Sequence, residues 1–151
     1  MGKFNFKLES LLNHRQFVED VRQKAFAQTQ KRVFEARQIV ESIKDEQLRL
    51  ARELKENMQT PQPASENALY ASYLASLDSR LDEQRQRLQE VEKERDEQKT
   101  SLLEAVKNRK MMERLKELQM GQFEQFCLKK EQELSDEIGI QQHSRKMVIQ
   151  N

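Results

Sequence analysis

The fold is decided by one stretch of the sequence, Thr60-Pro61-Gln62-Pro63-Ala64-Ser65-Glu66. Its two prolines remove backbone N–H donors and force the residues before them into extended geometry, so a helix that arrives here must stop near Met58. Ser65 can start a new helix, because its hydroxyl accepts hydrogen bonds from free amides of the first turn. Glu66 is favourable beside the positive end of that helix dipole. The stretch therefore predicts one turn between two helices.

The composition on either side of this turn favours long helices. Of the 151 residues, 35% are charged, 36% are apolar and only 6% are aromatic, with three glycines and two prolines. So few aromatic side chains argue against a thick layered core, and so much apolar content argues against a disordered chain. The formal net charge of +1 provides no general attraction to nucleic acid or to an acidic membrane. We expect a helical coiled coil that does not bind nucleic acid.

Heptad spacing supports this expectation on both sides of the turn. In the first arm the predicted seam is apolar at Leu8, Leu11, Val18, Ala25, Ala36, Ile39, Ile43 and Leu50, and is diluted by Arg15, Arg22, Thr29, Arg32 and Glu46. In the second arm it is apolar at Leu74, Leu77, Leu81, Leu88, Val91, Leu102, Ala105, Met112, Phe123 and Phe126. Each arm needs a partner to cover its stripe, and the short connection permits only antiparallel packing.

The predicted fold is all-α, a long antiparallel two-helix coiled-coil hairpin in which the second helix overhangs the first. We assign residues 1–58 to the first helix, 59–66 to the turn, 67–138 to the second helix and 139–151 to a flexible tail. Residues past about 120 then lack a partner within the chain, and the apolar side chains there indicate a binding surface. Gly121 is a candidate bend, and Gly139 a candidate helix end. Self-association is also possible, since two helices alone bury little surface.

The residue pattern contains no recognisable catalytic, cofactor or metal site. The glycines are too few to build a phosphate-binding loop, and His14 and His143 lie far apart without a second ligand at helical spacing. Cys127 has only Lys129 and Lys130 beside it, so a partly buried apolar role is favoured over a nucleophilic one. Neither a cofactor nor an enzymatic activity is predicted.

Three short motifs, taken in order and spacing, resemble the FliJ family of the bacterial flagellar type III export apparatus. The opening Phe4-Asn5-Phe6-Lys7-Leu8-Glu9-Ser10-Leu11-Leu12 is similar to the family's F-x-F-x-L-x-x-L-L. The segment after the turn, Tyr70-Ala71-Ser72-Tyr73-Leu74-Ala75-Ser76-Leu77-Asp78, resembles its Y-x-x-[YF]-[LI]-x-x-L-[DE]. Glu113-Arg114-Leu115-Lys116-Glu117 is similar to a later E-x-L-K-like segment. The resemblance covers essentially the whole chain.

The resemblance implies a non-enzymatic adaptor of flagellar protein export. Family members resemble the coiled-coil shaft of the gamma subunit of rotary ATPases and dock at the centre of the hexameric export ATPase, promoting its assembly and activity. They also contact the cytoplasmic part of the membrane export gate and handle export chaperones. The expected location is the cytoplasm, with peripheral association at the inner-membrane base of the flagellum.

The resemblance also implies two partner-binding regions. The gate-binding face lies in the half of the hairpin near the turn, and alignment on the Tyr-Leu motif places there Ile39, Ile43, Leu50, Tyr73, Leu77 and Gln84. The ATPase ring is expected to contact the opposite end, at Leu8, Leu11, Phe123 and Phe126. Independently of the family, Tyr70 and Tyr73 either pack against the turn or form a binding hot spot, for which tyrosine is enriched.

Other functions fit the same pattern. A homodimeric coiled-coil scaffold would tether other proteins without stimulating an ATPase. The stalk of a virulence-type secretion system would bind a different ATPase ring, and an export chaperone would bind unfolded export substrates.

Overall fold

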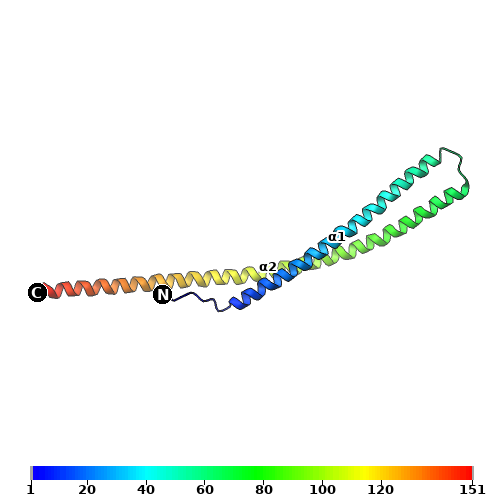
Figure 1. Ribbon diagram of the computed structural model, residues 1–151. Helices are drawn as coiled ribbons and strands as arrows, with labels where there is room; N and C mark the ends of the chain where they lie inside the picture. The colour runs from blue at the N-terminus through cyan, green and yellow to red at the C-terminus, as the bar shows by residue number, and fades with distance from the viewer. Residues whose placement is uncertain (1, 151) are drawn as a thin grey trace. The chain divides into compact units, whose positions relative to one another are not determined.

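A computed structural model describes residues 2–150, and within that range the secondary structure is entirely helical. Helix α1 spans Glu9–Asn57 and helix α2 spans Ala64–Ile149. The two helices pack against each other as an antiparallel hairpin, which confirms the predicted fold class (Figure 1). The chain divides into two compact units. We call Glu19–Glu104 the turn unit, and Met1–Val18 together with Ala105–Asn151 the terminal unit.

The turn lies at the two prolines. Backbone hydrogen bonds from Met58 N to Leu54 O (3.0 Å) and from Thr60 N to Asn57 O (3.3 Å) close the end of α1. The first bond of the next helix runs from Glu66 N to the carbonyl of Pro63 (3.1 Å). Since α2 begins at Ala64, Ser65 lies inside its first turn and not at the cap position that the sequence suggested.

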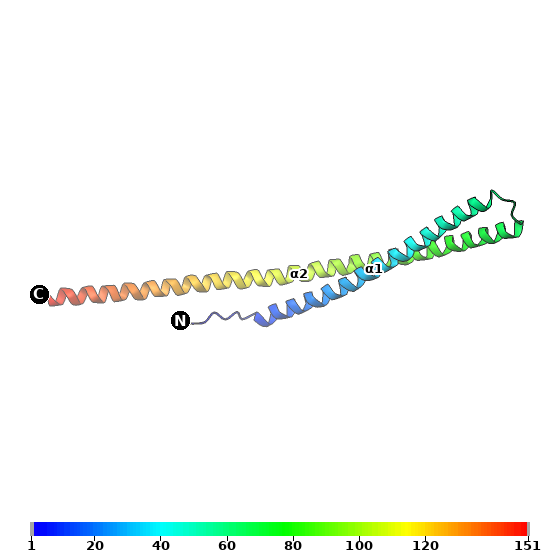
Figure 2. The same cartoon turned by 45° about the horizontal axis from the view of Figure 1, so that its top comes forward.

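The core of the turn unit is an apolar cluster shared by both helices. Its buried members are Val40, Ile43, Leu50, Leu77 and Leu81, and Tyr70, Leu74 and Leu88 pack against them half-buried. In two views the helices of this unit run side by side from the turn (Figures 1 and 2). Burial of this cluster is what holds the two helices together beside the turn.

The seam of α2 follows the prediction more closely than the seam of α1. On α2, every predicted seam position from Leu74 to Phe123 is buried or half-buried. On α1, Thr29, Ala36, Ile43 and Leu50 are buried as expected, but the alternate seam positions are shifted by one residue. Val33 and Val40 are buried in place of Arg32 and Ile39. Either choice keeps a heptad spacing, but burying Val33 and Val40 leaves the charged guanidinium of Arg32 at the surface, where it need not lose its hydration.

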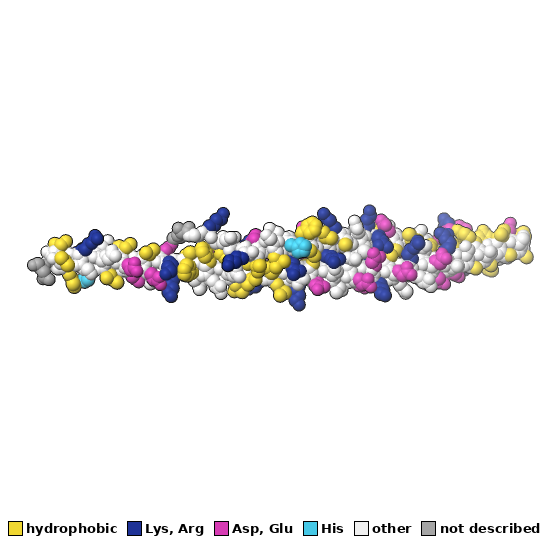
Figure 3. Space-filling model, turned by 90° about the horizontal axis from the view of Figure 1, so that it is seen from below, with side chains coloured by type: hydrophobic (Ala, Val, Ile, Leu, Met, Phe, Trp, Pro, Cys, Tyr) yellow, Lys and Arg dark blue, Asp and Glu magenta, His cyan; other side chains and the backbone are white. Residues whose placement is uncertain are grey.

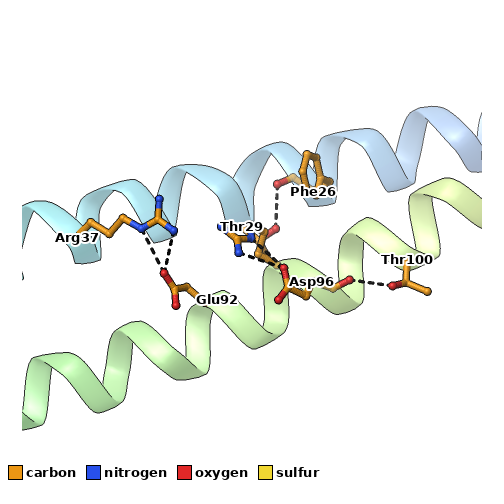
Figure 4. A network of polar contacts seen from close by, with 7 residues as sticks. Phe26, Thr29, Arg37, Glu92, Asp96 and Thr100 are labelled. Atoms are coloured by element: carbon orange, nitrogen blue, oxygen red, sulfur yellow. Dashed lines mark hydrogen bonds and ion pairs between the residues drawn. The ribbon is translucent and has the colours of Figure 1, made fainter.

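Polar contacts join the helices farther from the turn. Arg37 donates from Nε and Nη2 to one oxygen of Glu92 (3.2 and 2.9 Å), and Arg32 donates from Nη1 to both oxygens of Glu94 (2.9 Å each). Figure 4 shows the Arg37–Glu92 pair and, beside it, Thr29, whose hydroxyl donates to the carbonyl of Phe26 (2.9 Å) on its own helix. That bond satisfies the buried hydroxyl, which explains how a polar residue occupies the seam.

The terminal unit begins with a segment that is not helical. Residues 2–8 precede α1, so the predicted first helix over 1–58 starts too early; residue 1 lies outside the described residues. Apolar Phe4, Phe6 and Leu8 alternate with polar residues, a period that suits extended chain better than helix. The helical ladder starts at the carbonyl of Leu8, which accepts from Leu12 N (3.0 Å). We call residues 2–8 the N-terminal strap.

Helix α2 passes through both glycines of its distal part. The expected helix end near residue 138 is wrong, since α2 continues through Gly139 to Ile149, and residue 151 lies outside the described residues. Neither glycine has a positive φ, and a Cβ built at Gly121 or Gly139 would meet nothing within 4 Å. One helical glycine costs about 1 kcal/mol relative to alanine, which is too little to end a helix whose following residues contain no proline. The flexibility expected of residues 139–151 stays a prediction.

Candidate partner-binding surfaces

An open groove lies beside the turn, within the turn unit. It has a volume of about 430 Å³ and is lined by Leu50, Glu66, Leu69, Tyr70 and Tyr73. Leu69 is 71% exposed and Tyr73 is 42% exposed, so an aliphatic and an aromatic side chain face solvent together. Exposed apolar side chains beside a concave surface are typical of a protein-binding site.

The two tyrosines of this groove have different roles. Tyr70 is half-buried against the core, and its hydroxyl oxygen accepts a hydrogen bond from Asn57 Nδ2 (3.1 Å) at the end of α1. The hydroxyl of Tyr73 donates to the carboxylate of Glu46. This hydrogen bond is the main cause that raises the pKa of Tyr73 above its ordinary value, with smaller contributions from desolvation and from the negative charge of Glu46. Of the two alternatives, Tyr70 fits the packing role, whereas Tyr73 is available to a partner.

The residues expected to contact the export gate separate into two groups. Ile43, Leu50 and Leu77 are buried between the helices, where Leu77 has no exposed surface. Ile39 is 46% exposed because the α1 seam uses Val40 instead. Gln84 is half-buried, and its Oε1 is buried without a hydrogen-bond partner. The structure thus leaves Ile39 and Tyr73 as the two clearly exposed members of the predicted face.

Ile39 borders a second open groove of the turn unit. The groove has a volume of about 450 Å³, and buried Ala36 and Val91 line it together with charged residues such as Arg87 and Glu90. In the space-filling view, basic and acidic side chains are interspersed over the right half of the visible face, and hydrophobic side chains gather left of the middle and at the right end (Figure 3). The second groove therefore offers a partner both basic and acidic side chains, among them Arg87 and Glu90.

All the residues expected to contact the ATPase ring lie in the terminal unit. Leu8 and Leu11 are partly exposed, at 39% and 38%. Phe123 is half-buried, because the ring of Phe4 packs against it with a centroid separation of 5.7 Å. Phe126 is 58% exposed, with Lys130 Nζ lying 5.8 Å above its ring. The four predicted residues are thus all at least partly accessible.

Along the distal part of α2, an apolar face continues past Phe123, and from Leu128 onward nothing in the described chain covers it. We define the distal stripe as Phe123, Cys127, Leu134 and Ile138, spaced by four, seven and four residues. Since a helix turns about 100° per residue, these positions fall within a narrow sector of one face. Every residue from Leu128 to Gln150 is exposed, including Leu134 at 59% and Ile138 at 55%. A lone helix that keeps such a stripe in water is suited to binding another surface.

Sequence reasoning missed some of these residues. Leu69 was not among the predicted contacts, although its place one residue before Tyr70 would have allowed the inference. Phe4 and Phe6 entered only as part of a family motif, yet Phe6 is 4% exposed and belongs to the core of the terminal unit. Their alternation with polar residues was the signal that could have separated them from α1.

The described residues give little indication of a nucleophilic or metal-binding site. Cys127 is half-buried, and no cluster of His, Cys, Asp and Glu within residues 2–150 could hold a metal ion. Neither helix has a stretch in the described range that is both long and apolar enough to cross a membrane.

Fold and surfaces together define an all-α coiled-coil hairpin with candidate partner-binding surfaces and with no metal-ligating cluster among its described residues. The chain belongs to the FliJ family, because the profile of the flagellar FliJ protein matches residues 4–148. No curated protein and no solved structure matches it significantly. The family is a non-catalytic component of the flagellar protein export apparatus, so the chain is a flagellar export-apparatus protein.

Proposed function

We propose that this protein is the coiled-coil adaptor of the flagellar export ATPase. It binds the centre of the hexameric ring through its terminal unit, promotes assembly and activity of the ring, and links it to the cytoplasmic part of the membrane export gate. It acts in the cytoplasm, peripherally attached at the inner-membrane base of the flagellum, and also contacts export chaperones. The observation that carries the proposal is the exposed apolar surface that α2 presents at Phe126, Leu134 and Ile138, in a chain of the FliJ family.

The chemistry of the distal stripe suits insertion into a narrow opening. A helix without a neighbour is slim, since its diameter with side chains is about 10–12 Å. Binding would remove the exposed side chains of Phe126, Leu134 and Ile138 from water. Such burial favours binding by about 25 cal/mol of free energy for each Å² of apolar surface. Phe126 offers the large aromatic side chain that interface hot spots favour.

Gate binding is assigned to the groove beside the turn and to the neighbouring exposed residues. Ile39, Leu69 and Tyr73 are accessible without any change of the hairpin. The buried Ile43, Leu50 and Leu77 would support this surface from beneath, and Gln84 lies half-buried farther along the same helix as Tyr73. A partner therefore meets a surface whose rigidity depends on the core of the turn unit.

Ring binding is tested with matched leucine substitutions on α2. Leu134→Asp places a charge in the distal stripe, and Leu118→Asp places the same charge at a similarly exposed leucine on the opposite side of the helix. We expect Leu134→Asp to weaken binding to the purified export ATPase at least about tenfold, because a buried unpaired carboxylate is costly, while Leu118→Asp binds like wild type. Equal effects of the two substitutions would refute this placement of the ring contact.

Gate binding is tested separately with Tyr73→Ala and Leu69→Ala, measured against the soluble part of the export gate. Each is expected to weaken binding about five- to thirtyfold, the effect of losing one to two kcal/mol at a hot spot. Leu103→Ala, an exposed leucine of the same unit outside the groove, is the control. Unchanged binding by both groove variants would exclude this surface.

The alternative of a homodimeric scaffold makes a different prediction for the same stripe. A second copy covering Leu134 would double the mass in sedimentation, and Leu134→Asp would restore the monomer without any ATPase being present. An export chaperone would instead bind unfolded export substrates. The stalk of a virulence-type secretion system would bind another ATPase ring.

A further inference from the structure

The N-terminal strap covers part of the face of α2 that continues into the distal stripe. Phe6 is buried, and its ring lies 6.0 Å from Lys116 Nζ of α2. Phe4 contacts Phe123, the first residue of the distal stripe. Glu9, just after the strap, pairs with the same Lys116 at 2.8 Å. All these contacts lie within the terminal unit.

The strap and a partner of the distal stripe would compete for the same surface. Lys116 and Phe123 are seven residues apart, and Cys127, Leu134 and Ile138 follow at steps of four, seven and four residues. At about 100° per residue these five positions lie on one side of α2. A partner that extends along this side toward the start of α1 must therefore meet Phe4 before it meets Phe6.

The strap is suited to leave this surface without unfolding α1. Residues 2–5 belong to no helix and precede Phe6, whose carbonyl accepts from Glu9 N (3.1 Å) at the start of α1, so their release leaves the backbone bonds of the helix in place. Phe4 is only half-buried, whereas Phe6 is buried and closer to the first turn of α1. Release can thus begin at Phe4 while Phe6 and the Glu9–Lys116 pair still hold the start of α1 in place.

We propose that the N-terminal strap is a displaceable cover of the ATPase-binding surface, which Phe4 leaves when the ring engages the distal stripe. This inference rests on the proposed function, because the displacing partner is the export ATPase ring. The ATPase can bind this surface only in molecules whose strap is open. The apparent affinity for the ATPase is therefore reduced in proportion to the fraction of open molecules, and removal of the strap contact tightens binding.

The first test compares Phe4→Ala with wild type and with Lys7→Ala in binding to the purified export ATPase. Lys7 is an exposed strap residue, and its substitution leaves the two strap aromatics in place. We expect Phe4→Ala to tighten the apparent Kd about three- to tenfold and Lys7→Ala to leave it unchanged. Circular dichroism of each variant establishes that the helices are intact.

The second test follows the strap directly. The chain has no tryptophan, so Phe4→Trp introduces a unique fluorophore at the contact with Phe123. We expect its emission to shift to longer wavelength when the ATPase is added, because the indole moves from a packed site into water. Emission that stays constant or shifts to shorter wavelength on binding would overturn the cover, since the strap would then remain seated.

The outcomes separate the cover from the proposed function. Weaker or unchanged ATPase binding by Phe4→Ala, with wild type binding normally, would overturn the cover alone. Weaker binding would in addition make Phe4 part of the binding surface. Binding by Phe4→Ala in the absence of detectable wild-type binding would support the cover. Absence of binding by wild type and by every variant would overturn both proposals.

Discussion

Leu77 illustrates how single residues of the turn unit hold the hairpin. Its side chain has no exposed surface and lies in the cluster with Val40, Ile43 and Leu81. Close packing leaves such a site little room to relax, so loss of side-chain atoms leaves a cavity. The same residue stands in the predicted gate-binding set, where its contribution is to support the exposed neighbours.

Shortening the side chain of Leu77 should therefore lower the stability of the fold considerably. Leu77→Ala is expected to lower the free energy of unfolding by about 2–5 kcal/mol, through lost apolar burial and the cavity left behind. Leu103→Ala, at a leucine of the same unit that is 59% exposed, should change it by no more than about 0.5 kcal/mol. Urea unfolding followed by circular dichroism measures both, and similar losses for the two variants would contradict the assigned core.

Gln98 is a polar residue whose burial between the helices lowers the free energy of unfolding. It occupies a seam position of α2, and its Oε1 is buried without a hydrogen-bond partner. Replacement by leucine removes the unpaired oxygen and adds apolar surface, so Gln98→Leu should stabilise the fold by about 1–2 kcal/mol. Gln89→Leu, at an exposed position nearby, is the control. A destabilised Gln98→Leu variant would show that the amide makes a favourable contact.

Tyr73 provides a test by titration. Its hydrogen bond to the Glu46 carboxylate raises the pKa of Tyr73, so the folded state holds the phenol proton more tightly than the unfolded state does. The stabilising contribution is complete below the ordinary tyrosine pKa of 10.0 and is lost as the pH rises through the higher pKa of the folded protein. Glu46→Gln should move the Tyr73 titration, followed by ultraviolet absorbance, to lower pH. An unmoved titration would show that the contact does not persist in solution.

At the level of elements, the sequence predicts the hairpin well because its signals are local and strong. Two prolines end α1 regardless of packing, and the heptad spacing of Leu74, Leu81 and Leu88 marks the seam of α2. The seam of α1 was harder to predict, because Ile39 and Val40 are adjacent apolar residues. Their side chains point in directions about 100° apart around the helix, so only one of them can face α2. Which of the two faces the core depends on how α2 approaches.

The two chain ends could not be predicted for different reasons. The strap leaves the helix because Phe4 and Phe6 find partners on α2 more than a hundred residues away in sequence, a contact that no local pattern contains. Helix α2 continues because Gly139 is a weak breaker when no proline follows. The exposure of Phe126 and of the apolar residues after it follows directly from the sequence, because α1 is too short to reach them. Their role as a contact of the ATPase ring stays a prediction.

The ion pairs between α1 and α2 are expected to favour one register with little effect on stability. Arg37 and Glu92 are 52% and 32% exposed, and pairs of this kind contribute about 0.2–1 kcal/mol. Arg37→Glu should destabilise the hairpin slightly, and adding Glu92→Arg should restore it, with a coupling energy that falls at high salt. A double-mutant cycle in urea measures this coupling. Zero coupling at low salt would mean that the pair does not form.

For the whole molecule, the two candidate surfaces depend on different features of the chain. The groove beside the turn is supported by a buried apolar core, and changes there should act on gate binding through Tyr73 and Leu69. The distal stripe is supported only by the helix that bears it, so substitutions at Leu134 or Ile138 should leave the free energy of unfolding nearly unchanged, within about 0.5 kcal/mol. This separation allows the two proposed interactions to be tested one at a time.

The most direct test of the account is ATP hydrolysis by the purified flagellar export ATPase, measured across a concentration series of this protein. We predict stimulation that saturates below one molecule per ATPase subunit, as expected when one adaptor serves a whole ring. The stimulation should be lost with Leu134→Asp and retained with Leu118→Asp. Hydrolysis that is unaffected at every concentration, with no co-migration of the two proteins, would contradict the adaptor function and favour the scaffold or chaperone alternative.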